Sequence, residues 1–171
     1  MVKWLVPGKY VSMDIEKILD KLGDKLYNYL TIKLGSPQDA EDVLQEVFYR
    51  VLKYRVRLQF KRNPSAYLFQ MARNETVNHL KQRKKDLNIQ RSGKGLAQVI
   101  QKSLKGADPE KLNHISEALA QIPDDQREVI VLKFFEDLTF KEIARVCGVS
   151  VGTISSRYRY GMQKLRQIME E

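Results

Sequence analysis

The 171-residue sequence contains one cysteine and only two histidines. A single thiol excludes an intramolecular disulfide, and the apolar helical segment around Cys147 indicates a buried thiol rather than a redox centre. His79 and His114 lie far apart, without a cysteine or second histidine at ligand spacing, so we expect no metal site. The sequence also lacks a glycine-rich phosphate loop, a nucleophile elbow and a Ser/His/Asp grouping. We therefore expect no catalytic residues, no cofactor and no enzyme activity.

Long hydrophobic runs are absent as well. No apolar run approaches the length that crosses a bilayer, and the stretch 2–6 is too short and interrupted for a signal peptide. We expect a cytoplasmic protein that does not insert into membranes and takes no small-molecule substrate.

Positive charge is abundant, and it is concentrated in the first half of the chain. Lysine and arginine number 30 against 21 acidic residues, which gives a net charge of +9. Residues 1–91 carry 18 basic and 10 acidic residues, whereas residues 113–171 carry 8 and 9. This balance predicts a polyanionic partner, with most of the attraction in the first half.

Apolar residues recur at helical spacing through most of the sequence. The first apolar stripe covers 13–34 and stops at Gly35, a common residue after the end of a helix. Ser36-Pro37 and Asn63-Pro64 each combine a polar cap with proline at the first helical position, so they open a second and a third helix. The third helix ends in a basic cluster.

The helical pattern weakens over 86–112, which contains three glycines, a proline and few apolar residues. This composition is typical of a flexible linker, within which the pattern allows one transient helix around 96–104. We expect an all-α fold of two small helical domains joined by the linker, the C-terminal one containing a helix-turn-helix. In chain order the parts are a tail, a first domain, the linker and a second domain, covering 1–12, 13–85, 86–112 and 113–171.

The helix-turn-helix is predicted from several motifs that agree in register. Thr139 and Glu142 have the spacing of a capping box, and Gly148 lies where the turn needs a residue tolerant of positive φ. Ser150 caps the next helix, whose predicted core face consists of Ile154, Tyr158, Leu165 and Met169. The exposed candidates, near the end that such a helix inserts into the major groove, are Thr153, Ser155, Ser156, Arg157 and Arg159. The alternative is an ordinary helical hairpin, but the joint match favours DNA binding.

Taken in order, these motifs resemble those of an extracytoplasmic-function (ECF, group 4) sigma factor of the bacterial sigma-70 family, over about 14–168. The segment 39–48 is similar to the helix that binds core RNA polymerase. The segment 66–74, with the basic cluster after it, is similar to the helix that reads the promoter −10 element. LAQIP at 119–123 and VGTISSR at 151–157 are similar to the domain that reads the −35 element.

The resemblance implies that the first domain is sigma region 2 and contacts polymerase. An acidic, amide-bearing helix face in a basic half suits a protein partner, because carboxylates repel DNA phosphates. In the family this face binds the clamp helices of the polymerase β′ subunit, and here it consists of Asp39, Asp42, Gln45 and Glu46. The spacing alone fits an ordinary solvated face equally well.

The resemblance also implies a −10 site on the third helix. Asn74 and Asn78 project from one helical face, and an amide can pair with the edge of a flipped base of the opened strand. The loop before the helix would help to form the pocket, and basic side chains would hold phosphates. The remaining implied contacts are Lys61, Arg62, Asn63, Arg73, Lys81, Arg83, Lys84 and Lys85. Without the resemblance, a lone asparagine is more often a surface amide.

For the second domain the resemblance implies sigma region 4, which binds the −35 element and the polymerase β flap. The sequence departs from the family pattern in two places: Ser155 replaces a usual lysine or arginine, and Tyr160-Gly161 replaces Arg-Ala. A glycine inside a helix costs about 1 kcal/mol relative to alanine. The departures leave the −35 sequence preference open, but they do not affect the expected fold.

We therefore expect an alternative sigma factor that binds core RNA polymerase, directs promoter recognition and transcription initiation, and does no covalent chemistry. An anti-sigma factor would hold it inactive, either free in the cytoplasm or at the inner face of the membrane. One alternative is a stand-alone helix-turn-helix regulator, which predicts a homodimer on a palindromic operator. Another is a degenerate family member acting as an adaptor. Residues 1–12 are either a partner-binding extension or, as we favour, sequence before a start at Met13.

Overall fold

The computed structural model describes residues 13–53, 63–83, 97, 99–101 and 108–170. These residues are helical apart from short turns and contain no strand, as the all-α prediction requires. The predicted tail, and most of the predicted linker, lie outside the described residues. The helices are α1 (Met13–Leu34), α2 (Pro37–Lys53), α3 (Pro64–Arg83), α5 (Pro109–Ala120), α6 (Asp124–Phe134), α7 (Phe140–Cys147) and α8 (Val151–Glu170).

Helices α1, α2 and α3 form the first group, and their boundaries follow the predicted signals. Gly35 adopts a left-handed φ of 69°, and its N–H donates to the Thr31 carbonyl at 2.8 Å, which ends α1. The side-chain oxygen of Asn63 accepts from the Ala66 N–H at 2.8 Å and caps α3. Inside the group, Tyr29 and Phe69 are fully buried, and their rings pack edge to face with centroids 5.5 Å apart.

Helices α5 to α8 form the second group, in which α7 and α8 make the predicted helix-turn-helix. Thr139 and Glu142 form a complete capping box at the start of α7. Gly148 ends that helix with φ 68° and ψ 33°, a conformation that costs a residue with a Cβ more than glycine. Ser150 Oγ then accepts from the Thr153 N–H at 3.0 Å and caps α8. The joint prediction of cap, turn and cap is confirmed.

The predicted core face of α8 is correct near its start and wrong at its end. Ile154 is fully buried, and Tyr158 and Leu165 are partly buried. Met169, however, is 38% exposed. The reason is helical phase: Ile168 lies three residues after Leu165 and takes the position on the packed face.

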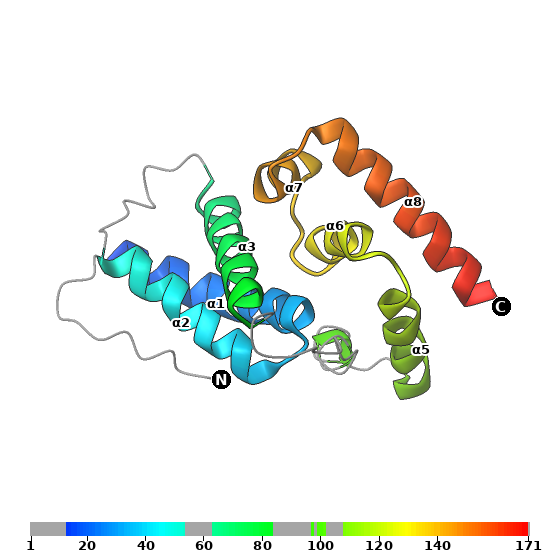
Figure 1. Ribbon diagram of the computed structural model, residues 1–171, viewed down its shortest axis with the longest axis horizontal. Coiled ribbons are helices and arrows are strands. Elements are labelled where there is room, and N and C mark those ends of the chain that lie inside the picture. Colours follow the sequence, from blue (N-terminus) through cyan, green and yellow to red (C-terminus); the bar gives the residue numbers. More distant parts are fainter. Residues whose placement is uncertain (1–12, 54–62, 84–96, 98, 102–107, 171) are drawn as a thin grey trace.

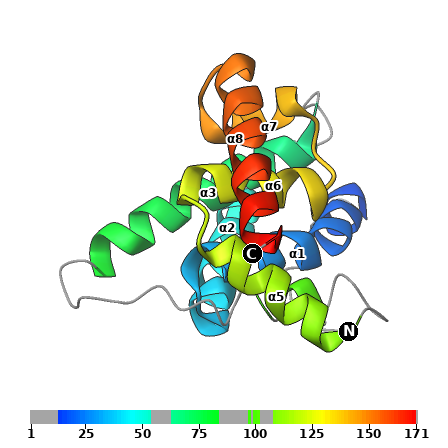
Figure 2. The same cartoon turned by 90° about the vertical axis from the view of Figure 1, so that its right-hand side faces the viewer.

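The two groups pack against each other through α3 with α7 and α1 with α6. In Figure 1, α6 and α7 lie between α3 and α8, and in Figure 2, turned by 90° from that view, α8 and α5 lie in front of the first group. One hydrophobic cluster contains Leu26 and Leu68 of the first group together with Val131 and Ile143 of the second. The sequence left this relative placement open.

Part of the predicted linker is ordered against the second group. Residues 97 and 99–101 are helical, and Val99 and Ile100 are buried. Ile100 packs with a small cluster that includes Leu112 and Ile130. Two adjacent apolar residues form no stripe, which explains why periodicity alone indicated only a flexible segment with a transient helix.

Candidate nucleic-acid and protein interface

The acidic face predicted on α2 is present, but Asp39 does not share it. Asp42 and Gln45 are exposed, and Glu46 is partly exposed. Asp39 is only 6% exposed, and its carboxylate lies 3.5 Å from Nε2 of His79 on α3. The prediction of an exposed Asp39 is wrong because this residue lies one turn before Val43, on the side of α2 that packs.

An arginine links the acidic face of α2 to α3. Arg50 places Nε 2.7 Å from a carboxylate oxygen of Glu46 and a terminal guanidinium nitrogen 2.7 Å from Glu75 on α3. The arginine therefore pairs with one acid on each of the two helices. Sequence reasoning missed Glu75, because the pairing depends on how α2 lies against α3.

The predicted polymerase face and the predicted −10 face border one groove. Its volume is about 540 Å³, and its wall includes Asp42 and Glu46 from α2 and Asn78, His79 and Lys81 from α3. The groove places the carboxylates of α2 beside the amide of α3. A macromolecule bound to the polymerase face therefore lies close to the −10 face.

The residues predicted for −10 contacts divide into three sets. Asn74, Asn78 and Lys81 are exposed on α3, as a DNA-contacting face requires. Asn63 and Arg73 are instead engaged by the second group. Outside the described part of the chain lie Lys61, Arg62, Lys84 and Lys85, together with the side chain of Arg83.

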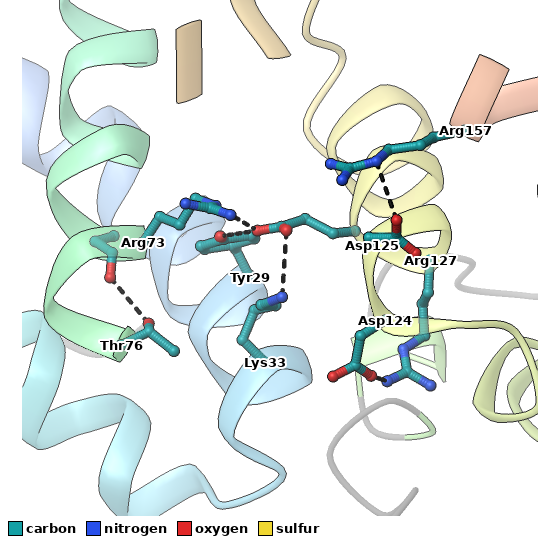
Figure 3. Close-up of polar contacts among 10 residues, drawn as sticks. Tyr29, Lys33, Arg73, Thr76, Asp124, Asp125, Arg127 and Arg157 are labelled. Carbon is teal, nitrogen blue, oxygen red and sulfur yellow. Dashed lines mark hydrogen bonds and ion pairs between the residues drawn. The ribbon is translucent and has the colours of Figure 1, made fainter. Parts of the chain in front are cut away.

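Arg73 takes part in a polar cluster centred on Glu128, the fifth residue of α6. Tyr29 donates its hydroxyl to Glu128 at 2.6 Å, the Lys33 ammonium lies 3.3 Å away, and Arg73 Nε lies 3.4 Å away. Figure 3 shows these three side chains converging from α1 and α3. Glu128 is 4% exposed. Burial of Tyr29 raises the pKa of its hydroxyl, and the nearby Glu128 carboxylate raises it further.

Sequence reasoning did not single out Glu128. A signal existed, since Glu128 directly precedes the apolar run VIVL at 129–132, and an acid is rarely buried on a helix face. Burying a carboxylate is costly unless hydrogen-bond donors or opposite charges surround it, and here the donor Tyr29 and the cations Lys33 and Arg73 all come from the other group of helices. Glu128 is therefore an inter-domain residue rather than a local one.

Asn63 makes a second polar link between the groups. Its side-chain amide donates to Oε1 of Glu142 on α7, while Oε2 of Glu142 accepts from the Thr139 N–H at 2.7 Å. The capping-box carboxylate therefore serves both α7 and α3. Asn63, predicted to line the −10 pocket, here joins α3 to the helix-turn-helix.

The predicted −35 residues on α8 differ in their exposure and in the contacts that they make. Ser155 and Arg159 are exposed. The Arg159 guanidinium lies over the ring of its neighbour Tyr160, with its carbon 4.9 Å from the ring centroid. Thr153 and Ser156 are partly exposed, and Thr153 shares a 2.9 Å hydrogen bond with Ser150. Arg157, partly exposed, lies 3.0 Å from a carboxylate oxygen of Asp125 on α6. Its guanidinium is therefore oriented by the second group itself.

The glycine at position 161, which departs from the family pattern, is explained by the close packing of α8 against α6. A Cβ at this position would lie 3.0 Å from Cδ1 of Ile130 and 3.2 Å from Cβ of Gln126. Glycine thus allows α8 to approach α6 closely, at the expense of helix propensity. The expected cost to the helix is therefore linked to a close helix–helix contact.

Cys147 is buried as predicted, and burial raises the pKa of its thiol to about 11. Within the described part of the chain, no three His, Cys, Asp or Glu side chains are grouped so that they could hold a metal ion. Nor does any helix among the described residues have the length and apolar character to span a bilayer.

Comparison with known families agrees with this geometry. Residues 18–86 match the family model of Sigma-70 region 2, and residues 118–167 match that of Sigma-70, region 4. The chain is 30% identical over 164 residues to the ECF RNA polymerase sigma factor SigW of Bacillus subtilis (strain 168), covering 90% of this chain and 88% of SigW. It is also 30% identical over 156 residues to the RNA polymerase sigma factor CarQ of Myxococcus xanthus, covering 91% and 89%.

Two solved structures share the fold at low sequence identity. The sigma factor RpoE from Bartonella quintana superposes with a TM-score of 0.72 at 21% identity, covering 92% of this chain and 97% of RpoE. CnrH superposes with a TM-score of 0.64 at 20% identity, covering 91% and 86%. With both sigma regions matched in order and SigW related along most of its length, the chain belongs to the ECF family of RNA polymerase sigma factors, which are transcription initiation factors.

Proposed function

We propose that this chain is an alternative sigma factor whose region 2 covers 13–85 and whose region 4 covers 113–171. Region 2 binds core RNA polymerase and the −10 element, and region 4 binds the −35 element and the polymerase β flap. The chain supplies recognition, and the polymerase performs the chemistry. The observation that carries this proposal is the shared groove, in which the acids of α2 border the amides of α3.

The acidic face of α2 is the proposed contact with the polymerase β′ clamp helices. Asp42, Gln45 and Glu46 project from it, and Glu46 pairs with Arg50 one turn later. Asp39 supports the face from below through its contact with His79. Carboxylates on this face disfavour DNA, so the polymerase protein is the better partner here.

Promoter DNA is the proposed partner of α3 and α8. Asn74 and Asn78 would pair with an unstacked −10 base, and the basic residues around α3 would contact phosphates. On α8, Ser155, Ser156 and the neighbouring arginines would enter the major groove at the −35 element. Two weak DNA contacts on one chain gain affinity through effective concentration.

An anti-sigma factor is the proposed regulatory partner. RpoE of Bartonella quintana is described in complex with the anti-sigma factor NepR, and CnrH in complex with the cytosolic domain of CnrY. We propose the same class of partner for this chain, in the cytoplasm or at the inner face of the membrane. The stand-alone regulator and adaptor alternatives predict a chain that does not need core polymerase.

Binding to purified core RNA polymerase tests this function. We expect the chain to bind stoichiometrically and the double variant Asp42→Lys/Glu46→Lys to lose binding. The matched control is Glu110→Lys/Glu117→Lys, which reverses two exposed charges on α5 and should bind normally. If the unmodified chain fails to bind, or if the control loses binding equally, the proposed interface is wrong.

A further inference from the structure

We propose that the free chain is autoinhibited by a contact between its own two domains, in which Glu128 and Glu142 of the second domain occupy residues of the first domain that promoter DNA requires. The proposal rests on the proposed function, because it takes α3 as the −10 helix. It adds a second mode of control, one that needs no anti-sigma factor.

Glu128 forms the centre of this contact. Tyr29 donates its hydroxyl to this carboxylate at 2.6 Å, and the Lys33 ammonium and Arg73 guanidinium form ion pairs with it at 3.3 and 3.4 Å. Glu128 is 4% exposed. The hydroxyl and the two cations form an anion site on the first domain, and the carboxylate fills it. A DNA phosphate at Arg73 would compete with the Glu128 carboxylate for the same guanidinium, so closure weakens phosphate binding.

Glu142 closes the other end of α3. It accepts from the side-chain amide of Asn63, at the start of the helix, while capping α7. Between the two links, α7 packs on α3, and Ile143 and Val146 join the hydrophobic cluster that contains Leu68. The start and the middle of α3 are therefore held against the helix-turn-helix domain, and a melted strand cannot lie between them.

The charge distribution explains how such a contact can remain reversible. The first domain carries the positive excess and the second is nearly neutral. At the contact, Glu128 places a carboxylate of the second domain against two cations of the first, Lys33 and Arg73. A buried ion pair contributes little net stability, because separation returns its charges to water. A phosphate at Arg73 can therefore replace the Glu128 carboxylate at modest cost.

Two substitutions, one on each side of the contact, provide the test. Glu128→Gln removes the buried charge, and Lys33→Gln removes one of its partners. Their controls are Glu117→Gln and Lys21→Gln, which neutralise exposed side chains on α5 and α1. Helix content by circular dichroism checks that each variant is folded. Because the sign of the charge change differs between the two substitutions, a general electrostatic effect cannot produce the same result in both.

The first readout is binding of the free chain to a short fluorescent single-stranded DNA of mixed sequence. We expect both Glu128→Gln and Lys33→Gln to bind about tenfold more tightly than the unmodified chain, as loss of a charged contact from the closed state implies. Ordinary electrostatics predicts the reverse for Lys33→Gln, since it removes a positive charge. Weaker binding by Lys33→Gln, at the level of Lys21→Gln, would overturn the proposal.

The second readout is the alkylation rate of Cys147, the only thiol in the chain. Cys147 is 6% exposed and belongs to the hydrophobic cluster that both domains share. Burial raises the pKa of its thiol, and the positive charges of Arg73 and Lys33 in the first domain act in the opposite direction. We expect both variants to react faster than their controls. Unchanged alkylation, or faster alkylation without tighter DNA binding, would overturn autoinhibition. Neither readout uses polymerase, so a failed polymerase interaction would be recognised separately.

Discussion

Gly161 of α8 lies so close to Ile130 of α6 that a Cβ would stand 3.0 Å from Cδ1 of the isoleucine. The glycine therefore fixes how near α8, the helix proposed to read the −35 element, sits to the helix that carries Glu128. This contact couples the geometry of the DNA-reading helix to that of the inter-domain contact.

We predict that Gly161→Ala destabilises the protein. Overpacking at this contact should cost about 2 kcal/mol, which exceeds the gain of about 1 kcal/mol in helix propensity. Urea unfolding measures the difference. Gly152→Ala is the control, because a Cβ there meets only Ser150 Oγ at 3.7 Å, so it should leave stability unchanged or increase it. Equal stabilisation by both substitutions would contradict the packing argument.

Gly148 gives a second prediction about the helix-turn-helix. Its φ of 68° is left-handed, and a Cβ at this position would meet no atom within 4 Å, so backbone conformation rather than crowding limits the choice of residue. Gly148→Ala should cost about 1 kcal/mol, and Gly148→Asn less, because asparagine tolerates this conformation better. Thermal unfolding of both variants checks the order, and an alanine variant as stable as the original chain would refute it.

Glu136 predicts a dependence of stability on pH. It is 3% exposed near the Lys25 ammonium of α1, which donates to its carbonyl oxygen at 3.3 Å, and burial raises the pKa of its side chain to about 8. Between the ordinary value of 4.5 and about 8, the folded state holds this proton and the unfolded state does not. The free energy of unfolding should therefore fall as pH rises through this window, by about 1.4 kcal/mol per pH unit.

Glu136→Gln should remove that part of the pH dependence, because an amide does not titrate. Urea unfolding at several pH values between about 5 and 8 gives the slope for both chains. Parallel slopes for the two proteins would show that Glu136 does not hold its proton in the folded state.

Asp125 and Arg157 give a prediction about the −35 face. Their carboxylate and guanidinium lie 3.0 Å apart, but the Asp125 side chain is 49% exposed, so the pair should contribute less than about 1 kcal/mol. Asp125→Asn should leave stability nearly unchanged and strengthen duplex DNA binding by the released Arg157. Binding titrations over a range of salt concentrations check this, with Arg157→Ala as the opposing variant. Unaltered affinity in both variants would remove Arg157 from the DNA-binding set.

Local patterns predicted the parts of this fold that depend on neighbours in sequence. The Thr139 and Glu142 capping box and the Gly148 turn were correct because capping and backbone conformation are decided within a few residues. Asp39 and Met169 were misplaced because exposure at the edge of an apolar stripe depends on which helix packs nearby. Core positions such as Ile154 were safer, since they lie at the centre of a stripe.

The contacts between the domains could not be predicted from the sequence. Tyr29 and Glu128 are 99 residues apart, and nothing local indicates that one carboxylate would collect donors from α1 and α3. The same holds for Asn63 and Glu142, 79 residues apart, each of which was assigned a local role that it also performs. The family resemblance predicted a DNA-contacting set, and the structure shows that two of its members, Arg73 and Asn63, contact the second group of helices.

The most direct test of the account is transcription from fragmented genomic DNA by core RNA polymerase, with and without this chain, followed by mapping of transcript 5′ ends. The account predicts start sites that require the chain and share two upstream elements, at −35 and −10. Asn74→Ala/Asn78→Ala should lose these starts while still binding polymerase. The account would be contradicted if the chain bound polymerase but produced no new start sites. It would also be contradicted if the Asn74→Ala/Asn78→Ala variant produced the same start sites as the unmodified chain.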